Sequence, residues 1–90
     1  MVVFILEKVP RSVRGELTRW LLEPKTGVFV GRVSGMVRDR LWQKVCDSPR
    51  TGGAILCHSA DTEQGFALRT HGEPTRELVD FEGLVLVRTP

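Results

Sequence analysis

Cysteine is scarce in this chain, and its scarcity narrows the classes of protein to which the chain can belong. The 90 residues include two cysteines, Cys46 and Cys57. Two are too few for a disulfide-stabilised scaffold, and their separation matches no zinc-binding spacing. We therefore expect two buried, reduced thiols and a cytoplasmic location.

Long hydrophobic runs are missing as well. The apolar start of the chain, Val2 to Leu6, is five residues long and is followed by Glu7. A secretory signal needs at least about seven apolar residues, and a membrane-spanning helix needs about 20. The sequence therefore predicts no signal peptide and no membrane partner.

Residues that commonly form catalytic centres are sparse too. His58 and His71 stand apart, and no Ser/His/Asp or Cys/His arrangement can be built around them. Cys57 and His58 are neighbours in an expected strand, so their side chains point to opposite faces. The glycine pair at 52–53 lacks the lysine of a P-loop. These absences disfavour a self-sufficient enzyme.

Arginine, by contrast, is abundant, although the net charge is only +2. Ten of the 13 basic residues are arginine, which binds phosphate through two parallel hydrogen bonds and stacks on bases, as lysine cannot. A thermophilic or high-GC source also favours arginine. The bias therefore leaves both a phosphate-binding surface and a compositional effect open.

Hydrophobic patterning predicts two helices among five short strands. Strands are expected at 2–6, 28–30, 54–57, 66–70 and 84–87. Apolar residues at helical spacing predict one helix from about Arg11 to Pro24 and another from Ser34 to Pro49. Ser12 is expected either to cap the first helix or to lie in its first turn. This order predicts an α+β fold, a two-layer sandwich with two helices on one mostly antiparallel sheet.

Two charged groups are candidates for function. Lys8, Arg11 and Arg14 surround the start of the first helix, where free backbone N–H groups also attract phosphate, and Arg76 can join them from a loop. The alternative is a solvated helix face. Acidic residues gather late in the chain, which suggests a second surface for a basic partner, or simply an ordinary charged surface. They are Asp61, Glu63, Glu77, Asp80 and Glu82.

Glu7 is the candidate for metal-dependent chemistry. It follows the first strand, and in a symmetric dimer two copies could hold Mg²⁺ against a phosphate. One carboxylate per subunit is a weak metal site, and the alternative is a solvated charge beside Lys8. The residues alone leave both interpretations open.

Four collinear segments resemble one known family. They are EKVP at 7–10 with RG at 14–15 and WLLE at 20–23, GVFVG at 27–31, TEQGF at 62–66 with THG at 70–72, and VDFEGL at 79–84. In these segments the chain is similar to the small CRISPR adaptation proteins of type I-E systems, the non-integrase subunits of the spacer integration complex.

The resemblance implies a fold and a set of partners. It implies a single ferredoxin-like domain over residues 1–90, with a core of about 1–72 and a partner-docking segment of about 73–90. It also implies a homodimer that bridges two dimers of the CRISPR integrase and holds duplex DNA by its phosphates. Because residues 31–33 alone separate the second expected strand from the second helix, we expect a very short central hairpin.

The resemblance also implies roles for particular residues. Arg14 and Arg76 match DNA-contacting arginines, while Ser12 and Thr75 stand where relatives carry further arginines. Glu63 and Glu82 match acidic positions that hold the integrase. The partner-docking strand corresponds to Leu84, Val85, Leu86 and Val87. The wider family is also assigned as a Mg²⁺-dependent endoribonuclease or endonuclease that relies on a carboxylate after the first strand; here that residue is Glu7, and Mg²⁺ would be needed for this alternative only.

Overall fold

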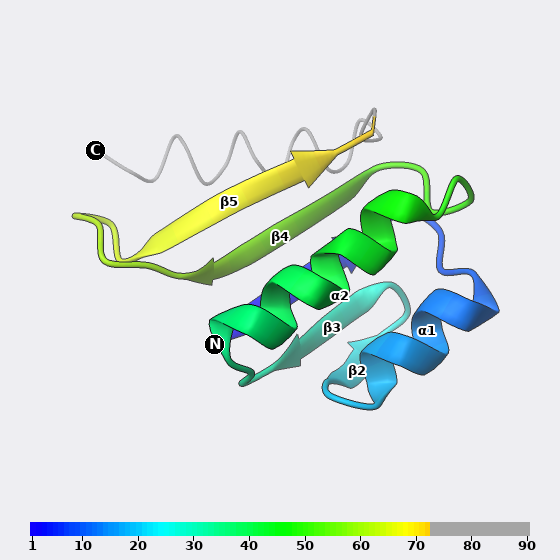
Figure 1. Ribbon diagram of the computed structural model, residues 1–90, viewed down its shortest axis with the longest axis horizontal. Helices are drawn as coiled ribbons and strands as arrows, with labels where there is room; N and C mark the ends of the chain where they lie inside the picture. Colours follow the sequence, from blue (N-terminus) through cyan, green and yellow to red (C-terminus); the bar gives the residue numbers. More distant parts are fainter. Residues whose placement is uncertain (73–90) are drawn as a thin grey trace.

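A computed structural model gives the structure of the protein and describes residues 1–72. Five strands and two helices follow one another along the chain (Figure 1). They are β1 (Val2–Leu6), α1 (Arg11–Thr18), β2 (Leu22–Lys25), β3 (Val28–Gly31), α2 (Gly35–Asp47), β4 (Ala54–Ser59) and β5 (Phe66–His71). Neither helix in this part of the chain is long and apolar enough to span a membrane.

The strands form one sheet in the order β2-β3-β1-β4-β5, and every neighbouring pair is antiparallel. Both helices lie on the same face of this sheet (Figure 1). The order of the first four strands is that of a ferredoxin-like sandwich, to which β5 adds a fifth strand beside β4. The expected α+β sandwich of two layers is therefore confirmed.

The core lies between the sheet and the two helices. Val2, Phe4 and Leu6 alternate along β1 and are buried against the helix layer, because successive strand residues point to opposite faces. Each helix presents an apolar stripe to them. The stripes consist of Val13 and Leu17 on α1 and of Leu41 and Val45 on α2.

The first helix is shorter than the sequence predicts. It ends at Thr18, before Pro24, because the amides of Trp20 and Leu21 both donate to the carbonyl of Leu17 and turn the chain. Leu21 still reaches the core, whereas the side chain of Trp20 is half exposed. Residues 22–25 instead form β2, which lies at the sheet edge, where Pro24 is tolerated because an edge strand can do without one N–H donor.

The central hairpin was therefore predicted at the wrong place. It joins β2 to β3 through Thr26 and Gly27 instead of lying at residues 31–33. Gly27 has φ = +85°, and a Cβ there would lie 2.7 Å from the carbonyl oxygen of Leu6. Its own carbonyl accepts from the Leu6 amide at 2.8 Å. Glycine is required here because the turn packs directly against β1.

Other expectations are confirmed. Residues 54–59 and 66–71 form the expected hairpin of β4 and β5. Ser34 caps α2, since its hydroxyl accepts from the Val37 amide at 3.2 Å. Ser12 lies in the first turn of α1, whose N-cap is Pro10. The strand expected at 84–87 lies outside the described residues.

Candidate functional site

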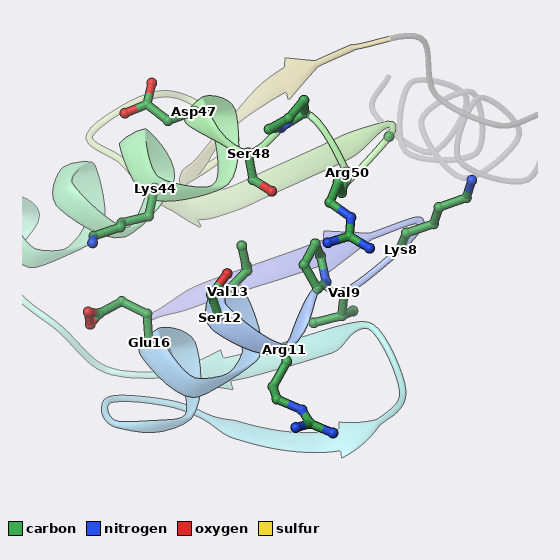
Figure 2. A pocket seen from close by; sticks show the side chains of 13 residues that line it. Lys8, Val9, Arg11, Ser12, Val13, Glu16, Lys44, Asp47, Ser48 and Arg50 are labelled. Atoms are coloured by element: carbon green, nitrogen blue, oxygen red, sulfur yellow. The ribbon is translucent and has the colours of Figure 1, made fainter.

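A groove separates the start of α1 from the end of α2 and has a volume of about 1260 Å³. We call it the α1–α2 groove. Its floor is the segment that joins β1 to α1, and its walls are α1 from Arg11 to Glu16 and the end of α2 with the turn that follows (Figure 2). The lining residues are Lys8, Val9, Pro10, Arg11, Ser12, Val13, Glu16, Lys44, Asp47, Ser48, Pro49, Arg50 and Gly52.

Sheet pairing brings the floor of the groove beside one of its walls. The last residue of β1, Leu6, pairs with the first residue of β4, Ala54. The segment that follows β1 and the turn that precedes β4 therefore lie side by side. Ser12 and Ser48 point toward the middle of the groove from its two walls (Figure 2).

The groove carries an excess of positive charge. Four of its lining residues are cationic and two are carboxylates. Both carboxylates have other partners, since Glu16 lies 3.6 Å from the guanidinium of Arg19 and Asp47 accepts from Gln43 at 2.9 Å. Within residues 1–72, by contrast, no ion pair involves the cations. These cations are Lys8, Arg11, Lys44 and Arg50.

Hydrogen bonds fix the turn that carries Arg50. The amide of Lys8 donates to the Thr51 carbonyl at 3.0 Å. The hydroxyl of Thr51 is fully buried and donates to the carbonyls of Val45 at 3.2 Å and Ser48 at 3.1 Å. The turn is thus held to β1 on one side and to the end of α2 on the other.

Glu7 belongs to the same network. Its amide donates to the Gly53 carbonyl at 2.9 Å, and its Oε2 accepts from the Gly53 amide at 3.1 Å. Gly52, with φ = +67°, lies against this carboxylate, since a Cβ there would be 3.4 Å from Oε1. Within one subunit, therefore, Glu7 acts as an acceptor for the turn.

The described residues of one subunit do not assemble a metal site. No group of three His, Cys, Asp or Glu side chains within residues 1–72 could hold an ion. One of the two Glu7 oxygens is already engaged by the Gly53 amide. A magnesium site at Glu7 would need donors beyond the described residues of this chain, and it stays a prediction.

The start of α1 adds a favourable environment for anions. Pro10 is the N-cap and provides no side-chain hydrogen bond, and no acidic residue occupies the first turn. A helix N-terminus carries a partial positive charge that attracts phosphate. Of the predicted phosphate-binding group, Lys8 and Arg11 both line the groove.

Arg14 turns away from the groove. Its guanidinium donates to both oxygens of Glu23, Nε to Oε1 at 3.1 Å and Nη2 to Oε2 at 3.3 Å. Glu23 also accepts from the Gly27 amide at 3.1 Å. Arg14 therefore ties α1 to the β2–β3 hairpin, while its side chain stays 43% exposed. The DNA contact implied for Arg14 stays a prediction.

The other candidate residues are distributed as follows. Glu63 is exposed in the turn between β4 and β5, at the opposite end of the sheet from the groove. Cys57 and His58 point to opposite faces as expected, with His58 buried and Cys57 half-buried. The remaining candidates, Arg76, Glu82 and Leu84 to Val87, lie outside the described residues.

A charged cluster lies at the opposite end of the molecule from the groove. Asp39 accepts from Nε of Arg38 at 3.0 Å and from Nη1 of Arg69 at 3.0 Å. The hydrogen bond from Arg38 is the main reason why the pKa of Asp39 lies below its usual value, and the hydrogen bond from Arg69 adds to this effect. Elsewhere, burial raises the pKa of the thiols of Cys46 and Cys57, which are both half-buried.

Sequence reasoning missed Lys44 and Arg50. Lys44 is one of several charged residues on α2, Arg50 is a single cation in the turn after it, and no local pattern marks either as functional. The signal that places Arg50 beside Lys8 is the pairing of β1 with β4, because it brings the turn at 51–53 to the end of β1.

Comparison with known protein families assigns nearly the whole chain to one family. Over residues 1–86 it matches the family described as CRISPR-associated protein (Cas_Cas2CT1978). The matched range includes every described helix and strand and all four cations of the groove. The protein therefore belongs to this family of CRISPR-associated proteins.

Proposed function

We propose that the protein is the non-integrase subunit of CRISPR spacer acquisition in a type I-E system. It acts as a homodimer that bridges two dimers of the CRISPR integrase and holds the captured duplex DNA by its backbone. It takes no part in the chemistry of integration, which belongs to the integrase. The observation that carries this proposal is the family match together with the cationic α1–α2 groove.

The groove supports sequence-independent binding of DNA. Lys8 and Arg11 lie beside an uncapped helix start, and no described carboxylate neutralises them. Contacts to phosphate fix the position of a duplex without reading its bases. This is the property that a subunit needs if it must accept DNA of any sequence.

The sheet face opposite the helices supports the homodimer. Four half-buried residues form one cross-strand row on this face, and both helices lie on the other face (Figure 1). The row consists of Val30, Val3, Cys57 and Leu68. Two sheets can pack face to face through such rows. A second copy of the chain would provide a matching sheet.

The decisive experiment is assembly. The purified protein is mixed with a type I-E integrase and a short duplex, and the mass of the complex is measured by light scattering at moderate salt. We expect one dimer of this protein with two integrase dimers. A folded protein that forms no such complex would contradict the proposal.

A nuclease assay addresses the alternative activity. Glu7→Gln is the suitable variant, because the amide oxygen of glutamine can still accept from the Gly53 amide and preserve the turn. We expect spacer acquisition to continue in this variant. Mg²⁺-dependent cleavage by the wild type that Glu7→Gln abolishes, together with a failure to assemble, would favour the nuclease instead.

A further inference from the structure

Two cations of the α1–α2 groove have no role in the function proposed above. Lys44 lies in the last turn of α2 and Arg50 in the turn that follows, across the groove from α1. We infer that both bind phosphates of the same nucleic-acid strand as Lys8 and Arg11, so that a phosphodiester backbone lies along the groove. This inference rests on the proposed function and extends its binding surface to a second helix.

The charge of the groove is the first reason for this inference. The two carboxylates of the groove are engaged by Arg19 and Gln43, whereas no carboxylate in the described part of the chain pairs with Lys44 or Arg50. The groove thus has two more positive than negative side chains, an excess equal to the net charge of the whole chain, +2. The favourable partner is a polyanion, because each phosphate neutralised releases counterions from the nucleic acid.

Position is the second reason. Arg50 is exposed, and Figure 2 shows its guanidinium near the base of Lys8. The turn that carries it is fixed by the hydrogen bonds of Thr51 and Glu7. A cation on a fixed backbone loses less conformational entropy on binding than one on a loop that must become ordered.

The size and chemistry of the groove indicate that its ligand is a nucleic-acid strand and not a small anion. The groove volume of about 1260 Å³ exceeds the roughly 300–1,000 Å³ that is typical of small-ligand pockets. A single phosphate would reach only part of it, while successive phosphates can reach cations on both walls. No Asn or Gln, the residues that pair with adenine edges, lines the groove, and the two duplexes of unrelated sequence used below test whether its cations contact the backbone alone.

The test measures DNA affinity against salt concentration for Arg50→Ala and Lys44→Ala. The full-length protein, alone and with the integrase, is titrated into two fluorescent duplexes of unrelated sequence. Each variant should lower the slope of log K against log salt by about 0.9, which makes binding about eightfold weaker at 0.1 M salt if the lines meet near 1 M. The loss should be the same for both duplexes, and Arg50→Lys should retain most of the affinity.

Arg32→Ala is the matched control, since Arg32 is an exposed arginine that follows β3 at the other end of the sheet. It should keep the slope of the wild type. If Arg50→Ala and Lys44→Ala also keep it while Lys8→Ala and Arg11→Ala lose affinity, the inference is overturned and the proposed function stands. If the wild type binds no duplex under any condition, both fail.

Inorganic phosphate separates a backbone site from a small-anion site. Calorimetric titration of the wild type with phosphate should show at most weak binding, because the groove is expected to need several phosphates at once. Phosphate binding that Arg50→Ala abolishes, with unchanged duplex affinity, would show that Arg50 serves a small anion and would overturn the inference.

Discussion

Glu7 shows that a carboxylate at a position suited to catalysis can have a structural role instead. It lies half-buried at the end of the central strand and accepts from the Gly53 amide. Sequence reasoning identified the position but not this partner, because Gly53 is distant in sequence. The metal-dependent activity that the sequence resemblance implies for Glu7 would use the same carboxylate as the hydrogen bond to the turn. Only a comparison of substitutions at Glu7 can separate the two roles.

We expect Glu7→Ala to lower the free energy of unfolding by about 1–2 kcal/mol, because the buried Gly53 amide loses its acceptor. Glu7→Gln should cost less than Glu7→Ala, since its amide oxygen replaces the carboxylate oxygen as an acceptor. Urea denaturation at a fixed protein concentration measures both. Equal losses in the two variants would mean that the charge of Glu7, and not its hydrogen bond, stabilises the turn.

Asp39 should make stability depend on acid pH. The hydrogen bonds from Arg38 and Arg69 lower its pKa in the fold below the ordinary 3.8. The folded state therefore favours the charged form, so the contribution is complete above that value and is lost as the pH falls through the lower folded pKa. Asp39→Asn should be less stable than wild type near neutral pH, and the difference should shrink in acid.

Urea titrations at a series of pH values check this. Asp61→Asn is the control, because Asp61 forms no ion pair within residues 1–72 and is exposed in the β4–β5 turn. A stability difference for Asp39→Asn that stayed constant down to the acid unfolding region would contradict the assignment.

At the scale of elements, the β2–β3 hairpin is the part that sequence reasoning placed wrongly. A continuous apolar run of β-branched and aromatic residues was sufficient to predict β1, and Ser34 and Pro49 were sufficient to bound α2. The end of α1 was not predictable in this way, because Leu21 falls on the helical stripe and yet reaches the core from a turn. Residue spacing alone does not distinguish a Leu21 that is buried from a helix from a Leu21 that is buried from a turn.

The contact between Arg14 and Glu23 should be measurable as a coupling between α1 and this hairpin. A double-mutant cycle with Arg14→Ala and Glu23→Gln should give a coupling free energy of about 0.5–1 kcal/mol, modest because the arginine is 43% exposed. Glutamine is chosen because it can still accept from the Gly27 amide.

The same pair of variants separates stability from DNA binding. If Arg14 contacts phosphate, Arg14→Ala should weaken duplex binding while Glu23→Gln, which leaves the guanidinium free, should not. Equal losses of affinity would indicate that Arg14 acts only by holding the hairpin in place.

At the scale of the molecule, the candidate phosphate-binding groove and the candidate partner-binding residue Glu63 lie at opposite ends of the sheet. The α1–α2 groove lies where β1 ends, and Glu63 lies at the other end, in the turn after β4. Sequence reasoning recognised a basic group early in the chain but only part of its membership. Lys8 and Arg11 were found from their neighbours in sequence, whereas Arg50 joins them only through the pairing of distant strands.

We expect a charge on the sheet face opposite the helices to dissociate the homodimer. Val3→Asp and Val30→Asp each place a carboxylate in the apolar row, and desolvating it in an interface should raise the dimer dissociation constant at least about 100-fold. Sedimentation measures the dissociation constant, and circular dichroism verifies that each variant is folded.

Gln64→Asp is the control for added charge, because Gln64 is exposed in the β4–β5 turn. It should dimerise like the wild type. Folded Val3→Asp and Val30→Asp proteins that also dimerise like the wild type would place the subunit contact elsewhere.

The central position of β1 has a consequence for the order of events during synthesis. The strand leaves the ribosome before the other described strands, yet one of its two neighbours is β4, and Val2 pairs with His58. The nascent chain can close β1 against β3 early, but the other edge of β1 must wait until the residues of β4 have left the exit tunnel. Contacts between distant residues form slowly. Until β4 pairs with it, the free edge of the apolar strand β1 is therefore the part of the nascent chain most exposed to chaperones and to premature association with other chains.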